Sequence, residues 1–316
     1  MTEADECGTT IKTPFGKEVD RREAHLDALP GKLYHEWFES LNRASKVFSG
    51  NTSELEKHLN KFVGTPMFVK ELPDDFGDQA ARLLHNYLAA LATLRDTQRT
   101  IHHKLWPDPD DKDPNRTKWE VKVWDPKRKE LYGDDSIAFL VKLRDYSLHY
   151  AIPIVTMGTS SRSTGGPGGP MQFKNTVAIQ RPELFKWDGW TAGARQYITT
   201  HDGDDIELFP LVALYSTRVR EFYAWFWKQV EDEVRLELSE YLCKHNEYCL
   251  WRHVEHTWAN FGMEGRRVQF RKAAEARLER AKFPTSGWRL FRLDENGEWV
   301  VGERDADWPP LPKGPR

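Results

Sequence analysis

The sequence predicts a mainly α-helical protein with an inserted β-hairpin and a small C-terminal extension of helix and hairpin. Two observations lead to this fold class. Two long stretches, 80–105 and 206–243, place apolar residues at the spacing of one helix face. Within 152–180, two β-rich runs flank a segment rich in Gly and Ser, as in a hairpin. We find no internal repeat.

The stretch 80–105 carries the clearest helical pattern of the chain. Its apolar positions are Leu84, Tyr87, Leu88, Leu91, Leu94, Ile101 and Leu105. This spacing predicts one long amphipathic helix. In 206–243 the corresponding positions are Val212, Tyr215, Val219, Phe222, Phe226 and Val230. That stretch is long enough that one helix and two helices fit it equally well.

The N-terminal part divides at Pro30-Gly31. Residues 1–30 show no sustained periodicity, so we expect a loosely ordered lead. Residues 31–77 form an N-terminal helical segment, with one helix over 32–48 and a second over 53–63, for which Ser53 is the expected N-cap.

A proline- and aspartate-rich segment, 106–118, predicts an exposed loop, because no helix or central strand accepts three prolines there. The run "WEVKVW" (119–124) predicts a short strand. A further helix begins at Asp135 or Ser136 and ends near Tyr150, since Pro153 biases Ile152 away from helical geometry.

The hairpin arms are "IPIVTMG" (152–158) and "MQFKNTVAIQ" (171–180). The "GGPGG" between them lacks the GK[ST] ending of a phosphate loop, so we expect a mobile hairpin tip. Residues 247–282 predict further helix. Asn296-Gly297 predicts a hairpin turn within 288–303, and the last twelve residues form an extended proline-rich tail.

Composition indicates a soluble protein of a reducing compartment. The net charge of −3 gives no global positive field, so binding of nucleic acid would need a local basic patch. Three widely spaced cysteines do not suggest a disulfide framework, which favours the cytoplasm. The first residues lack the pattern of a secretory signal, and no apolar stretch has the length of a membrane span.

The helix predicted over 137–151 carries an unusual charge. Its expected apolar stripe comprises Ile137, Leu140, Val141, Leu148 and Ala151, and Arg144 lies in the centre of that stripe. A buried guanidinium needs a carboxylate, carbonyl groups or an external anion. His149 lies about 140° around the helix, where it can converge with Arg144 on one phosphate. Alternatively, Arg144 extends to solvent or pairs with an acid from another helix, and His149 is an ordinary hydrogen-bonded residue.

The sequence "RDYSLH", Arg144 to His149, resembles the R-[N/D/H]-x-x-x-H signature of HEPN domains, a helical superfamily that includes many toxin and defence ribonucleases. The preceding "LLHNYLAALATLRD" (83–96) and the continuation "YAIPI" are also similar to that family, so the resemblance covers roughly 78–245. It implies a HEPN-like helical bundle. We therefore divide the chain into a lead (1–30), a helical segment (31–77), a HEPN-like domain with the hairpin (78–260) and a C-terminal part (261–316).

The resemblance implies a metal-independent endoribonuclease that needs no cofactor. Arg144 would hold the phosphate, His149 would transfer protons, and Asp145 would assist as a polar group. The RNA 2′-hydroxyl would attack the adjacent phosphate, leaving a cyclic phosphate and a free 5′-hydroxyl. Because such a reaction benefits from both a base and an acid, a twofold homodimer with two signature histidines is expected. The alternatives are a catalytically silent HEPN-like module that binds nucleotide, RNA or protein, and a purely structural helical protein.

Two basic stretches are candidates for RNA contacts. Arg95, Arg99, His102 and His103 are expected on one face of the 80–105 helix. In 265–283, the candidates are Arg266, Arg267, Arg271 and Lys272. Either stretch can equally be a solvated helix face.

Metal binding is not expected. His245, Cys249, His253 and His256 recur on one helix face, but one straight helix cannot wrap four ligands around a zinc ion. The tryptophans that gather late in the chain fit a protein partner, such as an antitoxin, although buried core would give the same composition.

Overall fold

The computed structural model describes residues 13–107, 117–164, 169–261, 290–293 and 299–302. The chain divides into a central unit, Phe38–Asp232, and a terminal unit made of Met1–Trp37 and Glu233–Arg316. Most described residues are helical, and an antiparallel hairpin is inserted among the helices, which confirms the predicted mainly α fold. No described helix combines the length and the apolar character that a membrane crossing requires.

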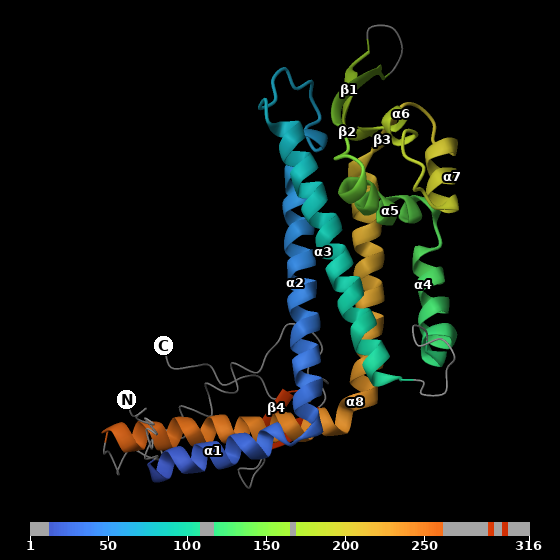
Figure 1. The fold of residues 1–316 in the computed structure, drawn as a ribbon. Helices are drawn as coiled ribbons and strands as arrows, with labels where there is room; N and C mark the ends of the chain where they lie inside the picture. The colour runs from blue at the N-terminus through green and yellow to red at the C-terminus, as the bar shows by residue number, and fades with distance from the viewer. Residues whose placement is uncertain (1–12, 108–116, 165–168, 262–289, 294–298, 303–316) are drawn as a thin grey trace, which may run out of the picture. The chain divides into compact units, whose positions relative to one another are not determined.

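Three long helices run side by side in the central unit (Figure 1). They are α2 (Pro30–Val63), α3 (Phe76–Leu105) and α8 (Leu208–Phe261), of which α2 and α8 continue into the terminal unit. Aromatic side chains take part in the contacts between them. The rings of Phe48 and Tyr87 lie 5.5 Å apart, and the Tyr87 hydroxyl lies 3.1 Å from the Ser216 hydroxyl. Because Tyr87 is completely buried, this hydrogen bond satisfies a polar group inside the core.

Shorter elements follow α3. A single π-helical turn, η1 (Glu120–Trp124), leads directly into α4 (Asp125–Tyr132), and α5 (Asp135–His149) comes next. After the hairpin, the short α6 (Arg181–Leu184) and α7 (Ala192–Thr200) precede α8. Thr191 caps α7 by accepting a hydrogen bond from the Ala194 amide.

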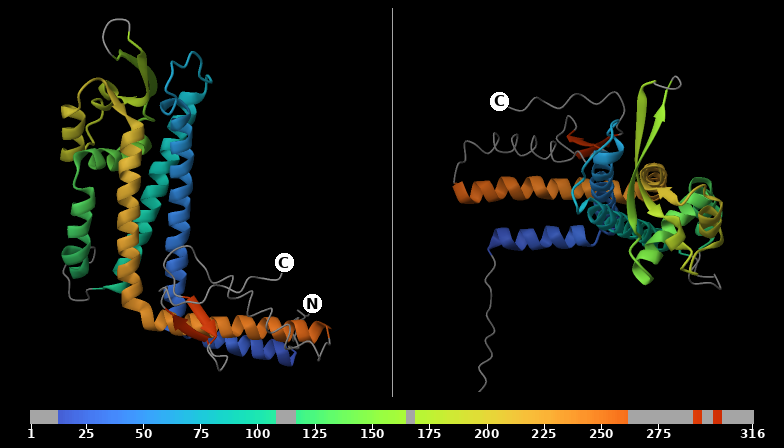
Figure 2. Two further views of the ribbon diagram at one scale, coloured as in Figure 1. Left: turned by 180° about the vertical axis from the view of Figure 1, so that it is seen from behind. Right: turned by 90° about the horizontal axis from the view of Figure 1, so that it is seen from above.

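The inserted hairpin forms a small sheet. Strands β1 (Val155–Ser163) and β2 (Met171–Gln180) pair antiparallel, and Figure 2 shows them extending beyond the helices. This confirms the hairpin and the bounds of its second arm, whereas the first strand begins at Val155 and continues to Ser163, beyond the predicted arm of 152–158. Residues 165–168 of the tip lie outside the described part. A third strand, β3 (Asp205–Glu207), pairs with β2. The buried Asn175 on β2 donates to the carbonyls of Thr65 and Met67 at 2.8 and 3.0 Å, which fixes the sheet against the segment after α2.

The terminal unit is held by aromatic contacts between α1 (Pro14–Asp27) and the C-terminal part of α8. The rings of Phe15 and Trp251 stack at 5.4 Å, and the Tyr248 hydroxyl donates to Glu23. Residues 14–27 of the loose lead expected for 1–30 therefore form helix α1, and residues 1–12 lie outside the description. Strands β4 (Leu290–Leu293) and β5 (Trp299–Gly302) pair antiparallel as predicted, although their turn is not described.

Three further predictions of local structure were wrong. Instead of a strand over 119–124, Trp119 is helical and Glu120–Trp124 form η1; the Trp124 side chain is buried against α8, with its ring 4.7 Å from that of Phe222. The helices expected over 32–48 and 53–63 are one helix, so Ser53 is no N-cap. Residues 205–207 form β3, not the start of a helix.

Polar residues inside α2 explain why it does not break. Asn51 and Thr52 hydrogen-bond the carbonyls four residues earlier, both at 2.9 Å, so their side chains are satisfied within the helix. Helix α8 is likewise uninterrupted to Phe261, since Pro210 lies in its first turn, where proline is tolerated, and no glycine follows within the helix. Of the further helix expected over 247–282, the residues beyond Phe261 lie outside the description.

Two glycines of α2 predict opposite responses to alanine. A Cβ at Gly31 would lie 2.6 Å from the Tyr241 Cβ and closer still to the Glu237 carbonyl oxygen, whereas a Cβ at Gly50 would meet nothing. We expect Gly31→Ala to lower the free energy of unfolding by about 1–3 kcal/mol through overpacking. Gly50→Ala should raise it by about 0.5–1 kcal/mol through helix propensity. Urea denaturation of both variants measures this, and equal effects would contradict it.

Candidate functional site

The candidate site lies on α5, whose packing is set by aromatic neighbours. Its buried residues are Ile137, Phe139, Leu140, Leu143 and Tyr146. The Phe139 ring lies 5.5 Å from Trp190 and 5.4 Å from Tyr197, and Tyr146 stacks on Trp190 at 5.4 Å. The helix ends at His149, and the amides of Tyr150 and Ala151 both donate to the Tyr146 carbonyl.

The orientation of α5 differs from the expectation. Leu148 is 47% exposed and Ala151 is also exposed, so the predicted stripe was wrong in its C-terminal half. Arg144 is not buried at the centre of an apolar face but half-buried at its edge, with 35% of its side chain exposed. The reason is tertiary, because residues 187–197 supply the aromatic surface that selects the buried face.

The charges around Arg144 come from α5 itself. A guanidinium nitrogen of Arg144 lies 3.7 Å from the Asp145 carboxylate, and the Lys142 ammonium donates to the other Asp145 oxygen at 2.7 Å. The Arg144 Nε is buried without a hydrogen-bond partner among the described residues. Within that same part of the chain, no acid on α8 forms an ion pair with Arg144. Arg144 therefore keeps donor capacity for a further anion.

His149 is exposed at the last turn of α5, and an exposed apolar run surrounds it. Leu148 and Tyr150 are 47% and 48% exposed, and Ile152 and Ile154 are 62% and 51% exposed. We name the four residues Leu148, Tyr150, Ile152 and Ile154 the apolar run. Contiguous exposed apolar residues commonly mark an interaction surface.

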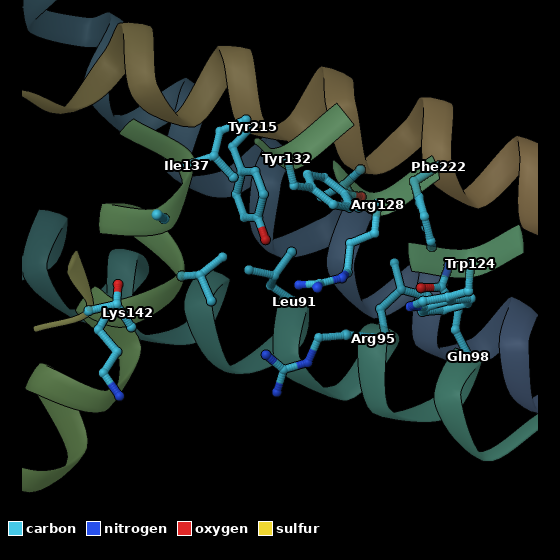
Figure 3. A pocket seen from close by; sticks show the side chains of 15 residues that line it. Leu91, Arg95, Gln98, Trp124, Arg128, Tyr132, Ile137, Lys142, Tyr215 and Phe222 are labelled. Atoms are coloured by element: carbon cyan, nitrogen blue, oxygen red, sulfur yellow. The ribbon is translucent and has the colours of Figure 1, made fainter. Parts of the chain in front are cut away.

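A cavity of about 280 Å³ opens beside the N-terminal half of α5 (Figure 3). Its walls include the apolar or aromatic side chains of Leu91, Tyr132, Tyr215 and Phe222. Arg95 from α3 and Arg128 from α4 point into the same region, whereas the Lys142 amino group turns away from them. The cavity thus combines apolar walls with two cations, a combination suited to an aromatic anion such as a nucleotide.

The predicted RNA-contacting residues of α3 are partly engaged with acids. Arg95 pairs with Asp96 at 3.1 Å, while Arg99 and His103 lie 3.9 and 3.7 Å from the Glu120 carboxylate. His102 was wrongly placed on this basic face, because its side chain is fully buried. Arg266, Arg267, Arg271 and Lys272 lie outside the described residues. Whether these residues contact RNA stays a prediction.

His102 lies in an aromatic enclosure that sequence analysis missed. Its ring is 4.7 Å from Trp124 and 5.6 Å from Trp119, and neither ring nitrogen has a hydrogen-bond partner among the described residues. Burial, reinforced by the nearby charges of His103 and Arg99, lowers the pKa of His102 to about 3, so the imidazole is neutral at pH 7. The adjacent His-His pair was the available signal, but nothing in the sequence pointed to Glu120 as its neighbour.

The histidine and cysteine face of α8 is only partly described. The Cys249 thiol lies 3.8 Å from the His245 ring nitrogens, whereas the side chains of His253 and His256 lie outside the description. Burial and the neighbouring His35 lower the pKa of His245, and burial raises the pKa of the Cys249 thiol. These shifts favour a neutral imidazole and a protonated thiol.

Comparison with known proteins adds no relationship. No family model, no curated protein and no solved structure matches this chain.

Proposed function

We propose that this protein is a metal-independent endoribonuclease of a toxin or defence type, acting as a homodimer in the cytoplasm. The observation that carries the proposal is the state of the Arg144–His149 pair. His149 is exposed, and the ion-pair partner of Arg144 among the described residues is its own neighbour Asp145, not an acid of another helix. A silent module would instead be expected to hold Arg144 in an internal ion pair.

The chemistry follows from these groups. Arg144 binds a phosphate oxygen and offsets the charge that develops in the transition state. The RNA 2′-hydroxyl attacks the phosphorus and loses its proton to a base, while the 5′-oxygen leaves and gains a proton from an acid. The products are a 2′,3′-cyclic phosphate and a free 5′-hydroxyl. Asp145, held by Lys142, acts as the polar helper that keeps Arg144 at the site.

A homodimer completes the site in this proposal. One chain supplies one signature histidine, His149, and the reaction uses both a base and an acid. The apolar run lies directly beside His149, so a twofold interface built on it brings the two histidines toward each other. Arg95 and the basic residues of 265–283 remain candidates for contacts with the RNA backbone, and a protein antitoxin would neutralise the enzyme.

The test is cleavage of end-labelled tRNA and total RNA by the purified full-length protein in EDTA, with circular dichroism confirming that the protein stays folded in that buffer. We expect cutting that survives EDTA and leaves cyclic-phosphate ends. Absence of cutting by folded wild-type protein, or cutting that His149→Ala and Arg144→Ala leave unchanged, would overturn the proposal.

The cavity of Figure 3 favours a second candidate, a silent module that binds a nucleotide. Under this alternative, nucleotide binding measured by calorimetry would be weakened by Arg95→Ala and Arg128→Ala, and no RNA would be cut. Substituting His149 would leave such binding unchanged, because His149 does not line the cavity. His149→Ala and Arg128→Ala therefore separate the two candidates, whereas Arg95→Ala does not, because Arg95 is also a candidate for contacts with RNA.

The proposed homodimer leads to a separate prediction. Ile152→Asp places a charge in the apolar run, so we expect a shift from dimer to monomer in analytical ultracentrifugation and a loss of cleavage of at least about tenfold. The control is Leu236→Asp, which changes an exposed apolar residue outside the run; Leu236 is 80% exposed and Ile152 is 62% exposed. A wild-type protein that is already monomeric would contradict the prediction.

A further inference from the structure

Three metal-capable side chains gather at the junction of α3 and η1. His102 and His103 lie in the last turns of α3, and Glu120 begins η1. One ligand atom from each of the three residues lies within 4.8 Å of the others. The cluster is on a different part of the central unit from the Arg144–His149 pair, and no step of the proposed cleavage uses it.

Hydrogen bonds and ion pairs among the described residues do not satisfy all the polar atoms of this cluster. His102 is fully buried, yet neither of its ring nitrogens has a hydrogen-bond partner in the described part of the chain. The Glu120 Oε2 atom is also buried and lacks a hydrogen bond. An ion pair between His103 and Glu120, whose atoms lie 3.7 Å apart, would still leave His102 unsatisfied. Buried polar atoms without partners carry a free-energy cost, so a missing partner is expected here.

We propose that His102, His103 and Glu120 bind a divalent zinc ion. Two imidazoles and one carboxylate form a donor set that zinc accepts, with a water in the fourth position. Zinc lies about 2.0–2.2 Å from such ligands, so one ion fits between His103 and Glu120 at their present 3.7 Å. Two ligands of one zinc ion lie at most about 4.4 Å apart, so separations of up to 4.8 Å within the cluster must shorten by a few tenths of an ångström when the ion binds.

The surroundings suit this ion. The Glu120 Oε1 atom lies 3.9 Å from Arg99, which leaves Oε2, the oxygen nearer His103, for the metal. The Thr117 hydroxyl accepts a hydrogen bond from the Glu120 amide at 3.1 Å and holds the start of η1 in place. The rings of Trp106 and Trp119 stack at 3.8 Å, which joins the end of α3 to the residue before η1.

The ion is therefore structural. It connects the C-terminal turn of α3 with η1, two elements that are separated along the chain, and stabilises the native state because it binds that state and not the unfolded chain. Because the metal lies outside the Arg144–His149 pair, its presence is compatible with a cleavage reaction that needs no metal.

Metal content and cobalt spectroscopy test the proposal on the full-length protein. After chelator treatment and desalting, Zn²⁺ titrated by calorimetry should bind at one strong site, and Co²⁺ should give the visible absorption of tetrahedral coordination. Glu120→Gln and His103→Gln should each reduce zinc affinity at least about tenfold and abolish the cobalt spectrum. The matched control is His85→Gln, a histidine on the same helix outside the cluster.

His103 is half-buried, so His103→Gln keeps the test valid if a substitution of the buried His102 or Glu120 fails to fold. Zinc binding that survives both Glu120→Gln and His103→Gln, or no binding by the wild type, would overturn the proposal. The readouts do not involve RNA, so a failure of zinc binding and a failure of the proposed ribonuclease are distinguished.

Discussion

Replacing His149 with alanine is expected to lower RNA cleavage by about 100- to 10,000-fold, the usual contribution of a general acid or base. The same change should alter the free energy of unfolding by less than about 0.5 kcal/mol, because the side chain is exposed at the end of α5. Initial rates on a labelled RNA substrate in EDTA measure the first effect, and urea denaturation measures the second. His25→Ala, which removes an exposed histidine on α1, is the control.

Substitutions of Arg144 distinguish the effect of its charge on the cleavage rate from the effect of its donor geometry. Arg144→Ala should lower the rate as strongly as the histidine substitution, whereas Arg144→Lys retains the charge but loses the planar, bidentate donor set. We expect the lysine variant to recover only a small part of the rate. Full activity in Arg144→Lys would indicate that a point charge is sufficient, and full activity in Arg144→Ala would contradict the role of Arg144 in catalysis.

Mixing experiments then test the shared site. An excess of His149→Ala protein, equilibrated with wild type, should suppress cleavage beyond simple dilution, because mixed dimers hold one histidine in place of two. Adding Ile152→Asp to the His149→Ala protein should remove this suppression, since the double variant no longer pairs. Suppression that is independent of Ile152 would indicate competition for RNA instead of a shared site.

Replacing Phe139 with alanine is expected to lower the free energy of unfolding by about 3–5 kcal/mol, the range for buried phenylalanine. Phe139 has no exposed surface and packs against Trp190 and Tyr197. Its removal takes away the contact that fixes α5 against α7, so the site helix should lose its orientation as well as its stability. The urea midpoint and near-ultraviolet circular dichroism both report this change.

Phe139→Leu is the matched variant, because it keeps most of the apolar volume. Its loss of stability should be clearly smaller than that of the alanine variant. Equal losses would indicate that the aromatic contacts, not the volume, hold α5. A negligible loss in Phe139→Ala would contradict the packing described above.

The fold could be predicted from the sequence wherever the residues of one helix or strand show its pattern by themselves. The apolar spacing of 80–105 identified α3, which the structure places at Phe76–Leu105, and two β-rich runs around a Gly- and Ser-rich segment identified the hairpin. The predictions failed where contacts with a segment distant in sequence determine the local structure. Trp124 is buried against α8, and residues 120–124 form a π-helical turn in place of the predicted strand; Trp190 selects the buried face of α5. Periodicity within one segment contains no information about such partners.

The same distinction between local patterns and long-range contacts applies to the candidate site. The motif at Arg144 and His149 could be recognised in the sequence because it lies within six consecutive residues. The cluster of His102, His103 and Glu120 could not be recognised in the sequence, since it forms only when Glu120 packs against the end of α3 in the folded chain. Glu120 was read as part of a strand, which would have given its side chain no defined relation to the histidines.

The stack of Trp106 on Trp119 has an optical consequence. Their ring planes are nearly parallel, with an angle of 8° and a centroid separation of 3.8 Å. Indoles at this separation couple their electronic transitions and produce a paired positive and negative band in circular dichroism. Trp187 and Trp190, 4.9 Å apart, couple in the same way, so the part of the signal that a Trp106→Phe variant lacks follows the junction of α3 and η1 during unfolding.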